Sequence, residues 1–137
     1  VGGLNQLLNN ANRLLSEENT DRVEQILANL ISNALKYSAA TEPVSVNLGA
    51  AGDRLYCRIE DSGIGIPADE LPRLFERFFR SRNAREISGL GLGLNIARHL
   101  AQIQDGDITV SSVEGEGTTF TLWLPAATGR NQDVHPR

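Results

Sequence analysis

The centre of the sequence is Asp61-Ser62-Gly63-Ile64-Gly65-Ile66-Pro67, where an apolar run ends in a carboxylate, two glycines and a proline. Leu55, Cys57 and Ile59 share one face of a predicted strand over 54–61, and the period of two places Asp61 on that same face. A carboxylate on the buried side is costly unless another group pairs with it, and the glycines beside it allow a ligand to approach the backbone closely. The alternative is an ordinary turn after a strand, because Asp-Ser-Gly is common turn chemistry. This stretch alone does not separate a binding site from a turn.

Composition limits the classes of protein that fit. A chain of 137 residues, 40% hydrophobic and 22% charged, is typical of one soluble globular domain with a single core. The net charge of −4 argues against nucleic acid as a partner. Cys57 is the only cysteine, which excludes an internal disulfide, and its place on the apolar strand face favours core packing over reactivity. No run approaches the roughly 18 apolar residues of a membrane span, and no signal peptide is recognised.

The strongest helical pattern follows Thr20 or Asp21, either of which can cap the helix, with Glu24 placed for a capping box. Its apolar residues recur at helical spacing and are Val23, Ile26, Leu27, Leu30, Ile31, Ala34 and Leu35. We expect this face to cover the core.

A polar stripe lies directly beside that apolar face and consists of Gln25, Asn29, Asn33 and Lys36. Asparagine lowers helix stability because its side chain competes for backbone hydrogen bonds, so two of them four residues apart need a reason. One explanation is a row of donors and acceptors that faces a polar ligand or its metal ion. The alternative is a pair of surface amides.

The other elements are predicted from periodicity and turn residues. An earlier helix is expected over 4–15, a short helix over 68–79 and a third helix over 95–104. Strands are expected over 44–48, 54–61, 108–112 and 118–124, the first two as a hairpin. The predicted organisation is an N-terminal helix and linker over 1–19, one domain over 20–126 and a frayed tail over 127–137.

Two further segments suit a phosphorylated ligand. Three alternating glycines in 89–94 open a helix, where free N–H groups and the helix dipole favour an anion. The spacing is neither the dinucleotide fingerprint nor a phosphate-binding loop followed by Lys and Ser or Thr, so by itself it is a weak signal. The polar run 80–88 contains arginines that could bind phosphate oxygens, and a plain solvated loop is the alternative.

In this order the segments resemble the catalytic ATP-binding domain of sensor histidine kinases, within the wider family that includes DNA gyrase, a heat-shock chaperone ATPase and mismatch-repair ATPases. The matching motifs are an asparagine box at 29–38, a first glycine box at 61–67, a phenylalanine box at 74–80, a second glycine box at 89–94 and a last glycine box at 115–120. The match spans roughly 21–125, and the phenylalanine box favours kinases over the other ATPases.

The resemblance implies an α/β (α+β) two-layer sandwich of the Bergerat type, with helices on one face of a mixed sheet and ATP between the helices and a lid over 81–88. It implies Asp61 on the adenine amino group, Asn33 as the Mg²⁺ ligand, and Asn29, Lys36 and Arg80 as catalytic residues at the phosphates. The remaining nucleotide-binding residues implied are Tyr37, Gly63, Gly65, Ile66, Phe78, Gly89, Leu90, Gly91, Leu92, Gly93, Leu94 and Thr118.

Three departures from the family pattern stand out. Leu90 occupies a position that is usually small or hydroxylated, Asp105 replaces a usual glycine, and no strand is visible between the first helix and the asparagine box. No phosphoacceptor histidine is recognised, because neither His99 nor His135 has the family's sequence context, and both are expected to be surface histidines.

The function implied is a protein-histidine kinase domain that transfers the γ-phosphoryl group of ATP to a histidine on a separate dimerisation domain, for relay to a response regulator. The domain alone would be a monomer, and the full protein a homodimer with this domain in the cytoplasm, anchored through a membrane segment elsewhere. The alternatives are a catalytically silent ATP-binding switch module, a serine kinase of the anti-sigma type, and a pure interaction domain. Failure to bind any adenine nucleotide would favour the last.

Overall fold

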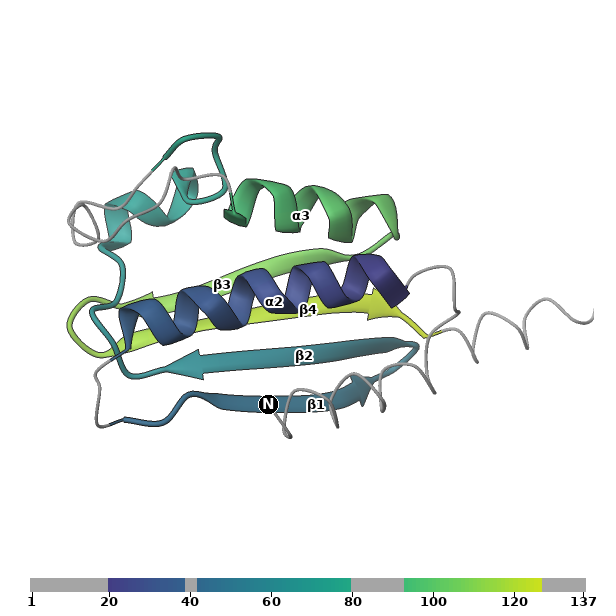
Figure 1. Cartoon of the computed structure of the whole chain (residues 1–137), viewed down its shortest axis with the longest axis horizontal. Helices are drawn as coiled ribbons and strands as arrows, with labels where there is room; N and C mark the ends of the chain where they lie inside the picture. The colour runs from purple at the N-terminus through teal and green to yellow at the C-terminus, as the bar shows by residue number, and fades with distance from the viewer. Residues whose placement is uncertain (1–19, 39–41, 80–92, 127–137) are drawn as a thin grey trace, which may run out of the picture.

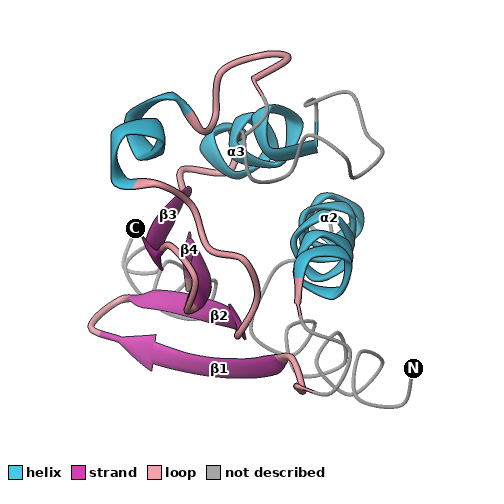
Figure 2. Ribbon diagram, turned by 90° about the vertical axis from the view of Figure 1, so that its left-hand side faces the viewer, coloured by secondary structure: helices cyan, strands magenta, loops and turns pink. Residues whose placement is uncertain are grey.

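Four antiparallel strands form one layer of the structure, and two α-helices cover one face of that sheet (Figures 1 and 2). The computed structural model describes residues 20–38, 42–79 and 93–126. Within them the elements follow the order α2 (Thr20–Tyr37), β1 (Ser45–Ala51), β2 (Arg54–Asp61), the 3₁₀ helix η2 (Ala68–Arg73), α3 (Gly93–Ile103), β3 (Asp107–Val113) and β4 (Gly117–Pro125). The predicted two-layer architecture is confirmed.

The sheet has the strand order β1-β2-β4-β3. Its covered face is built from rows of side chains that run across the strands in register. Two of these rows are apolar: Ile108, Leu122 and Cys57, then Val110, Phe120 and Ile59. Burial raises the pKa of the Cys57 thiol to about 12, so this residue packs in the core, as expected, and is not a reactive thiolate.

The strand predictions hold, with β2 matching 54–61 and the other ends shifted by a few residues. The resemblance implies a mixed sheet, whereas the three pairings among the described strands are all antiparallel. Two of the pairings are hairpins, which are antiparallel by construction. The third joins β2 to β4. The crossover through η2 and α3 returns the chain so that β3 runs in the same direction as β2, and the β3–β4 hairpin then reverses β4.

Helix α2 buries one stripe of its predicted apolar face against the sheet. Val23, Ile26, Leu27, Leu30 and Ala34 are at most 3% exposed. Leu35 was expected in this stripe, but it is 63% exposed. At about 100° per residue, Leu35 lies roughly 120° around the helix from Val23, which is outside the buried stripe.

The helix predicted over 68–79 is shorter and of a different type. It is the 3₁₀ helix Ala68–Arg73, which contains Pro72 and is followed by turns. Proline has no N–H to donate and resists continuation as an α-helix. Phe78 then adopts a positive φ of 64°, which no helix contains.

Helix α3 begins at Gly93, two residues before the predicted start, and packs against the core through the fully buried Ala97 and Ala101. Its last turn closes with a hydrogen bond from the Gly106 N–H to the Ala101 carbonyl, at 2.9 Å. Asp105 has a φ of 64° in that turn. A short polar side chain tolerates this conformation, so the replacement of the usual glycine has only a local effect.

Among the described residues, no helix has the length and apolar content needed to span a membrane. The predicted helix over 4–15, the polar run 80–88 and the tail over 127–137 lie outside the described part of the chain.

Two leucines on α2 offer a matched test of this packing. Leu30→Ala should lower the free energy of unfolding by about 2–5 kcal/mol, since Leu30 is fully buried. Leu35→Ala, the same change at an exposed position of the same helix, should alter it by less than about 0.5 kcal/mol. Urea unfolding followed by circular dichroism measures both. Equal losses would show that α2 is rotated from the orientation described.

Candidate functional site

Asp61 ends β2 on the covered face, next to the two apolar rows. It is half-buried, its Oδ1 accepts a hydrogen bond from the Gly63 N–H at 2.9 Å, and Thr118 of β4 is its partner in the strand register. Burial raises the pKa of this carboxyl above its usual range, and the backbone N–H groups of Gly63 and Thr118 oppose that rise. The sequence therefore predicted correctly that a carboxylate lies on the inward face at this strand end.

The glycine loop after Asp61 is held between α2 and the β3–β4 turn. The Ile64 N–H donates to the Tyr37 carbonyl at 3.3 Å, and the Ile64 carbonyl accepts from the Gly115 N–H at 2.9 Å. A Cβ on Gly63 would lie 1.9 Å from the Tyr37 carbonyl oxygen. Gly65 has a φ of 69°, and a Cβ there would lie 2.3 Å from the Val113 carbonyl oxygen. Both glycines are therefore required by close backbone contacts.

A second group of site residues lies where α2 meets the start of α3. The Asn29 side-chain Nδ2 donates to the Gly93 carbonyl at 3.4 Å. Among the described residues, no atom would lie within 4 Å of a Cβ on Gly93, the first residue of this helix. Free N–H groups at a helix start favour an anion in such a position.

Helix α2 joins the two groups. Asn29, Asn33 and Tyr37 follow each other at four-residue intervals and lie on one side of the helix, about 12 Å from first to last at 1.5 Å per residue. Asn29 contacts the start of α3, and the Tyr37 carbonyl contacts the glycine loop. Both asparagines are partly buried, which disfavours the alternative of two plain surface amides.

The structure thus assembles most of the predicted site residues that it describes. Asp61, Gly63, Gly65, Ile66, Thr118 and Tyr37 surround the end of β2. Where α2 meets α3, Asn29 contacts Gly93, the residue before Leu94. Asn33 lies one turn further along α2 than Asn29. Lys36 lies exposed in the last turn of α2. Arg80, Gly89, Leu90, Gly91 and Leu92 lie outside the described residues.

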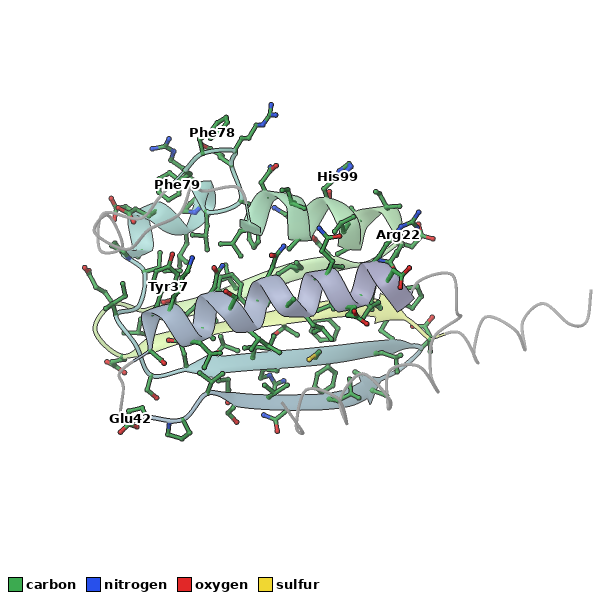
Figure 3. The ribbon with its side chains drawn as sticks, viewed as in Figure 1. Arg22, Tyr37, Glu42, Phe78, Phe79 and His99 are labelled. Carbon is green, nitrogen blue, oxygen red and sulfur yellow. The ribbon has the colours of Figure 1, made fainter. Side chains whose placement is uncertain are left out.

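Phe78 does not join these groups. It is 62% exposed and lies at the top of the view, beyond the start of α3 and away from the sheet, whereas Tyr37 lies at the end of α2, where its carbonyl contacts the glycine loop (Figure 3). His99 lies exposed on α3 (Figure 3), as expected of a surface histidine.

Sequence reasoning missed two polar residues that hold the site together. Ser112 of β3 accepts a hydrogen bond from the Ile66 N–H at 2.8 Å. Asn95 of α3 donates through Nδ2 to the Phe75 carbonyl at 3.0 Å and so ties α3 to the phenylalanine segment. A signal for Ser112 exists, because it continues the period of two set by Ile108 and Val110.

The residues present fit a nucleotide. Asp61 offers a carboxylate to an amino group, the glycine loop is packed closely beside it, and α3 offers a helix start with free N–H groups. Within the described ranges, no group of three or more His, Cys, Asp or Glu side chains could hold a metal ion by itself. A metal ion here would therefore rest on amide oxygen such as that of Asn33 together with ligand phosphates, a donor set that suits Mg²⁺.

Comparison with known proteins agrees with this geometry. The family described as "Histidine kinase-, DNA gyrase B-, and HSP90-like ATPase" matches residues 18–128. This chain belongs to that family. Its arrangement of one sheet layer and one helix layer is therefore the ATPase fold of the family.

Relatives of this chain include bacterial sensor proteins. Sensor histidine kinase WalK of Bacillus subtilis is 43% identical over 116 residues, which cover 82% of this chain and 19% of that protein. Aerobic respiration control sensor protein ArcB of Escherichia coli is 44% identical over 108 residues, which cover 77% of this chain and 14% of that protein. The chain spans about a fifth or less of the length of these two relatives.

Two solved structures share this fold. The mycobacterial sensor histidine kinase MprB has a TM-score of 0.73 and 32% identity, with 78% of this chain and 74% of that chain covered. Full-length ShkA in complex with AMPPNP has a TM-score of 0.70 and 32% identity, with 83% of this chain and 23% of that chain covered.

The raised pKa of Asp61 predicts how stability depends on pH. Between the ordinary pKa of an unfolded aspartate, about 3.9, and the raised native value, the native state binds more protons than the unfolded chain. The contribution of Asp61 to stability is therefore lost as pH rises through this window. Asp61→Asn cannot ionise, so the ligand-free variant should gain stability relative to wild type as pH rises from 4 to 7.

Urea unfolding at several pH values measures this difference. Asp53→Asn, which removes a carboxylate in the exposed β1–β2 turn, is the matched control. A constant difference between Asp61→Asn and wild type across this range would contradict the assignment.

Proposed function

We propose that this chain is the ATP-binding catalytic domain of a sensor histidine kinase, with the domain itself over 20–126. It transfers the γ-phosphoryl group of ATP to a histidine on a separate dimerisation domain, for relay to a response regulator. The half-buried Asp61 carboxylate beside the glycine loop carries this proposal. The kinase relatives, at 43% and 44% identity, support the reaction type.

The base of ATP lies at the Asp61 end of the site in this proposal. The Asp61 carboxylate accepts a hydrogen bond from the adenine amino group, and the inward placement of this carboxylate supports the role. Gly63 and Gly65 let the loop pack closely against the backbone of α2 and of the β3–β4 turn, which holds the loop beside Asp61. Ile66 and Tyr37 contribute apolar surface at the same end.

The phosphates lie at the other end, over the start of α3. The N–H groups of the segment from Gly89 to Leu94 bind the phosphate oxygens, helped by the helix dipole. Asn29, Lys36 and Arg80 neutralise and orient the phosphate groups there. Phosphoryl transfer needs mainly positioning and charge neutralisation, so this domain supplies no nucleophile, and none is required among its described residues.

Asn33 lies between the two ends and holds Mg²⁺ through its amide oxygen. The metal ion supplies neutralisation of phosphate charge when it is bound. The partial burial of Asn33 and its place one turn from Asn29 support this role, because a side chain fixed by packing holds a ligand atom in position.

The partners follow from the reaction. They are ATP, the dimerisation domain that carries the acceptor histidine, and a response regulator, with no nucleic acid. The isolated domain is a monomer, and the full protein is a homodimer with this domain on the cytoplasmic side of a membrane-anchored sensor.

Calorimetric titration with ATP, ADP and GTP tests the nucleotide assignment. We expect adenine-selective binding, which Asp61→Asn weakens by about 1–3 kcal/mol, the usual cost of an unmatched buried polar group. Asp53→Asn, exposed at the opposite end of β2, should bind as wild type does. Wild-type affinity in Asp61→Asn would overturn the role of this residue, and a folded chain that binds no adenine nucleotide would overturn the function.

Asn33→Ala separates the metal role from base binding. This variant should reduce Mg²⁺-dependent phosphotransfer in the full-length kinase at least tenfold and leave Mg²⁺-free ADP affinity within about threefold of wild type. Radiolabelled ATP and calorimetry measure the two effects. Gln25→Ala, exposed two turns earlier on α2, is the control. An equal loss in both measurements would place Asn33 in base binding instead.

A further inference from the structure

Three polar side chains form a row across three strands at the Asp61 end of the sheet. Asp61 of β2 is in register with Thr118 of β4, and Thr118 is in register with Ser112 of β3. These strands lie side by side in the order β2-β4-β3 (Figure 1). The row sits on the covered face, directly after the two apolar rows, so all three side chains point to the same side as the core.

The hydroxyl group of Ser112 has three hydrogen-bonding contacts. It accepts from the Ile66 N–H at 2.8 Å and donates to the Gly117 carbonyl at 2.8 Å. The third contact joins Ser112 Oγ to Thr118 Oγ1 at 2.9 Å.

The chemistry of the partners fixes the direction of that third bond. A carbonyl can only accept, so the Ser112 hydroxyl donates its single proton to the hydrogen bond with the Gly117 carbonyl. The Ile66 N–H can only donate, so it occupies one lone pair of Ser112. In the remaining bond Thr118 is therefore the donor, and the Ser112 hydroxyl is saturated with one bond donated and two accepted.

The saturation of Ser112 determines what the Thr118 hydroxyl can bind. Its hydroxyl proton is committed to Ser112, so its oxygen has only lone pairs to offer to anything else. Thr118 is 7% exposed and stands beside the Asp61 carboxylate, which is also an acceptor. The row therefore presents two acceptors next to each other and no side-chain proton.

We propose that Ser112 is a positioning residue that sets the base preference of this site by holding the Thr118 hydroxyl as an acceptor. Two adjacent acceptors match a group that carries two protons, such as the exocyclic amino group of adenine, and repel a carbonyl oxygen at that position. This inference rests on the proposed function, because it concerns the same nucleotide site. Ser112 itself does not touch the base, since its own hydrogen-bonding capacity is full.

The test compares ATP with inosine triphosphate, which has a carbonyl where ATP has the amino group. Calorimetry gives the ratio of the two dissociation constants for the wild-type chain and for Ser112→Ala. In this variant the Thr118 proton is released and can turn towards a carbonyl, so the preference for ATP should fall by about tenfold, the discrimination carried by one buried hydrogen bond.

The matched control is Ser111→Ala, the neighbouring serine, which is exposed on the opposite face of β3. It should keep the wild-type ratio. Ser112→Thr keeps a hydroxyl group and should restore the preference for ATP. A purely structural role for Ser112 predicts that Ser112→Ala weakens both nucleotides equally, and an unchanged ratio would overturn the proposal.

Two further outcomes are informative. If Ser112→Ala does not fold, Ser112→Cys replaces it, because a thiol is a weak hydrogen-bonding group. The ratio should then fall in Ser112→Cys and hold in Ser112→Thr, and equal ratios would overturn the proposal. A wild-type chain that binds ATP without preferring it to inosine triphosphate overturns this inference alone, whereas one that binds neither overturns the proposed function.

Discussion

The site depends on two backbone hydrogen bonds of Ile64, one to Tyr37 at the end of α2 and one to Gly115 in the β3–β4 turn, which together form a backbone clamp. Its N–H donates to the Tyr37 carbonyl, which has no partner within α2 because it lies in the last turn of the helix. Its carbonyl accepts from the Gly115 N–H. The clamp brings together segments of the chain that are far apart in sequence. It also explains why Gly63 and Gly65 flank Ile64, since any side chain would meet the backbone on either side.

The clamp also has an energetic cost, which is the partial burial of a charged carboxylate. Asp61 is drawn inward with the loop, and its carboxylate loses water that two backbone N–H groups only partly replace. A domain selected for stability alone would carry a neutral residue at this position. Retaining the acid is the usual sign of a group whose partner arrives with the ligand.

Sequence patterns predicted much of this arrangement because the strands and α2 bury one face each. The alternation of Leu55, Cys57 and Ile59 placed Asp61 on the inward face, and the asparagine stripe of α2 lies where the periodicity put it. The prediction of one helix over 68–79 was wrong, because the segment forms a 3₁₀ helix that ends at Arg73. The local effects of Pro72 and the positive φ of Phe78 outweigh the apolar spacing there. Ser112 was missed because its role depends on strand register, which joins residues that a single-strand pattern does not connect. The sequence also did not predict that β2 and β4 pair antiparallel, because this pairing depends on how the chain crosses the sheet between them.

Helix α2 also fixes the distance between the two ends of the site. The nine residues from Asn29 to Tyr37 are a rigid interval, with one end hydrogen-bonded to α3 and the other to the glycine loop. Inserting or deleting a single residue within it would turn one end by about 100° relative to the other. Loops elsewhere in such a chain can change length gradually during evolution, but this interval can change only if both ends are rebuilt together.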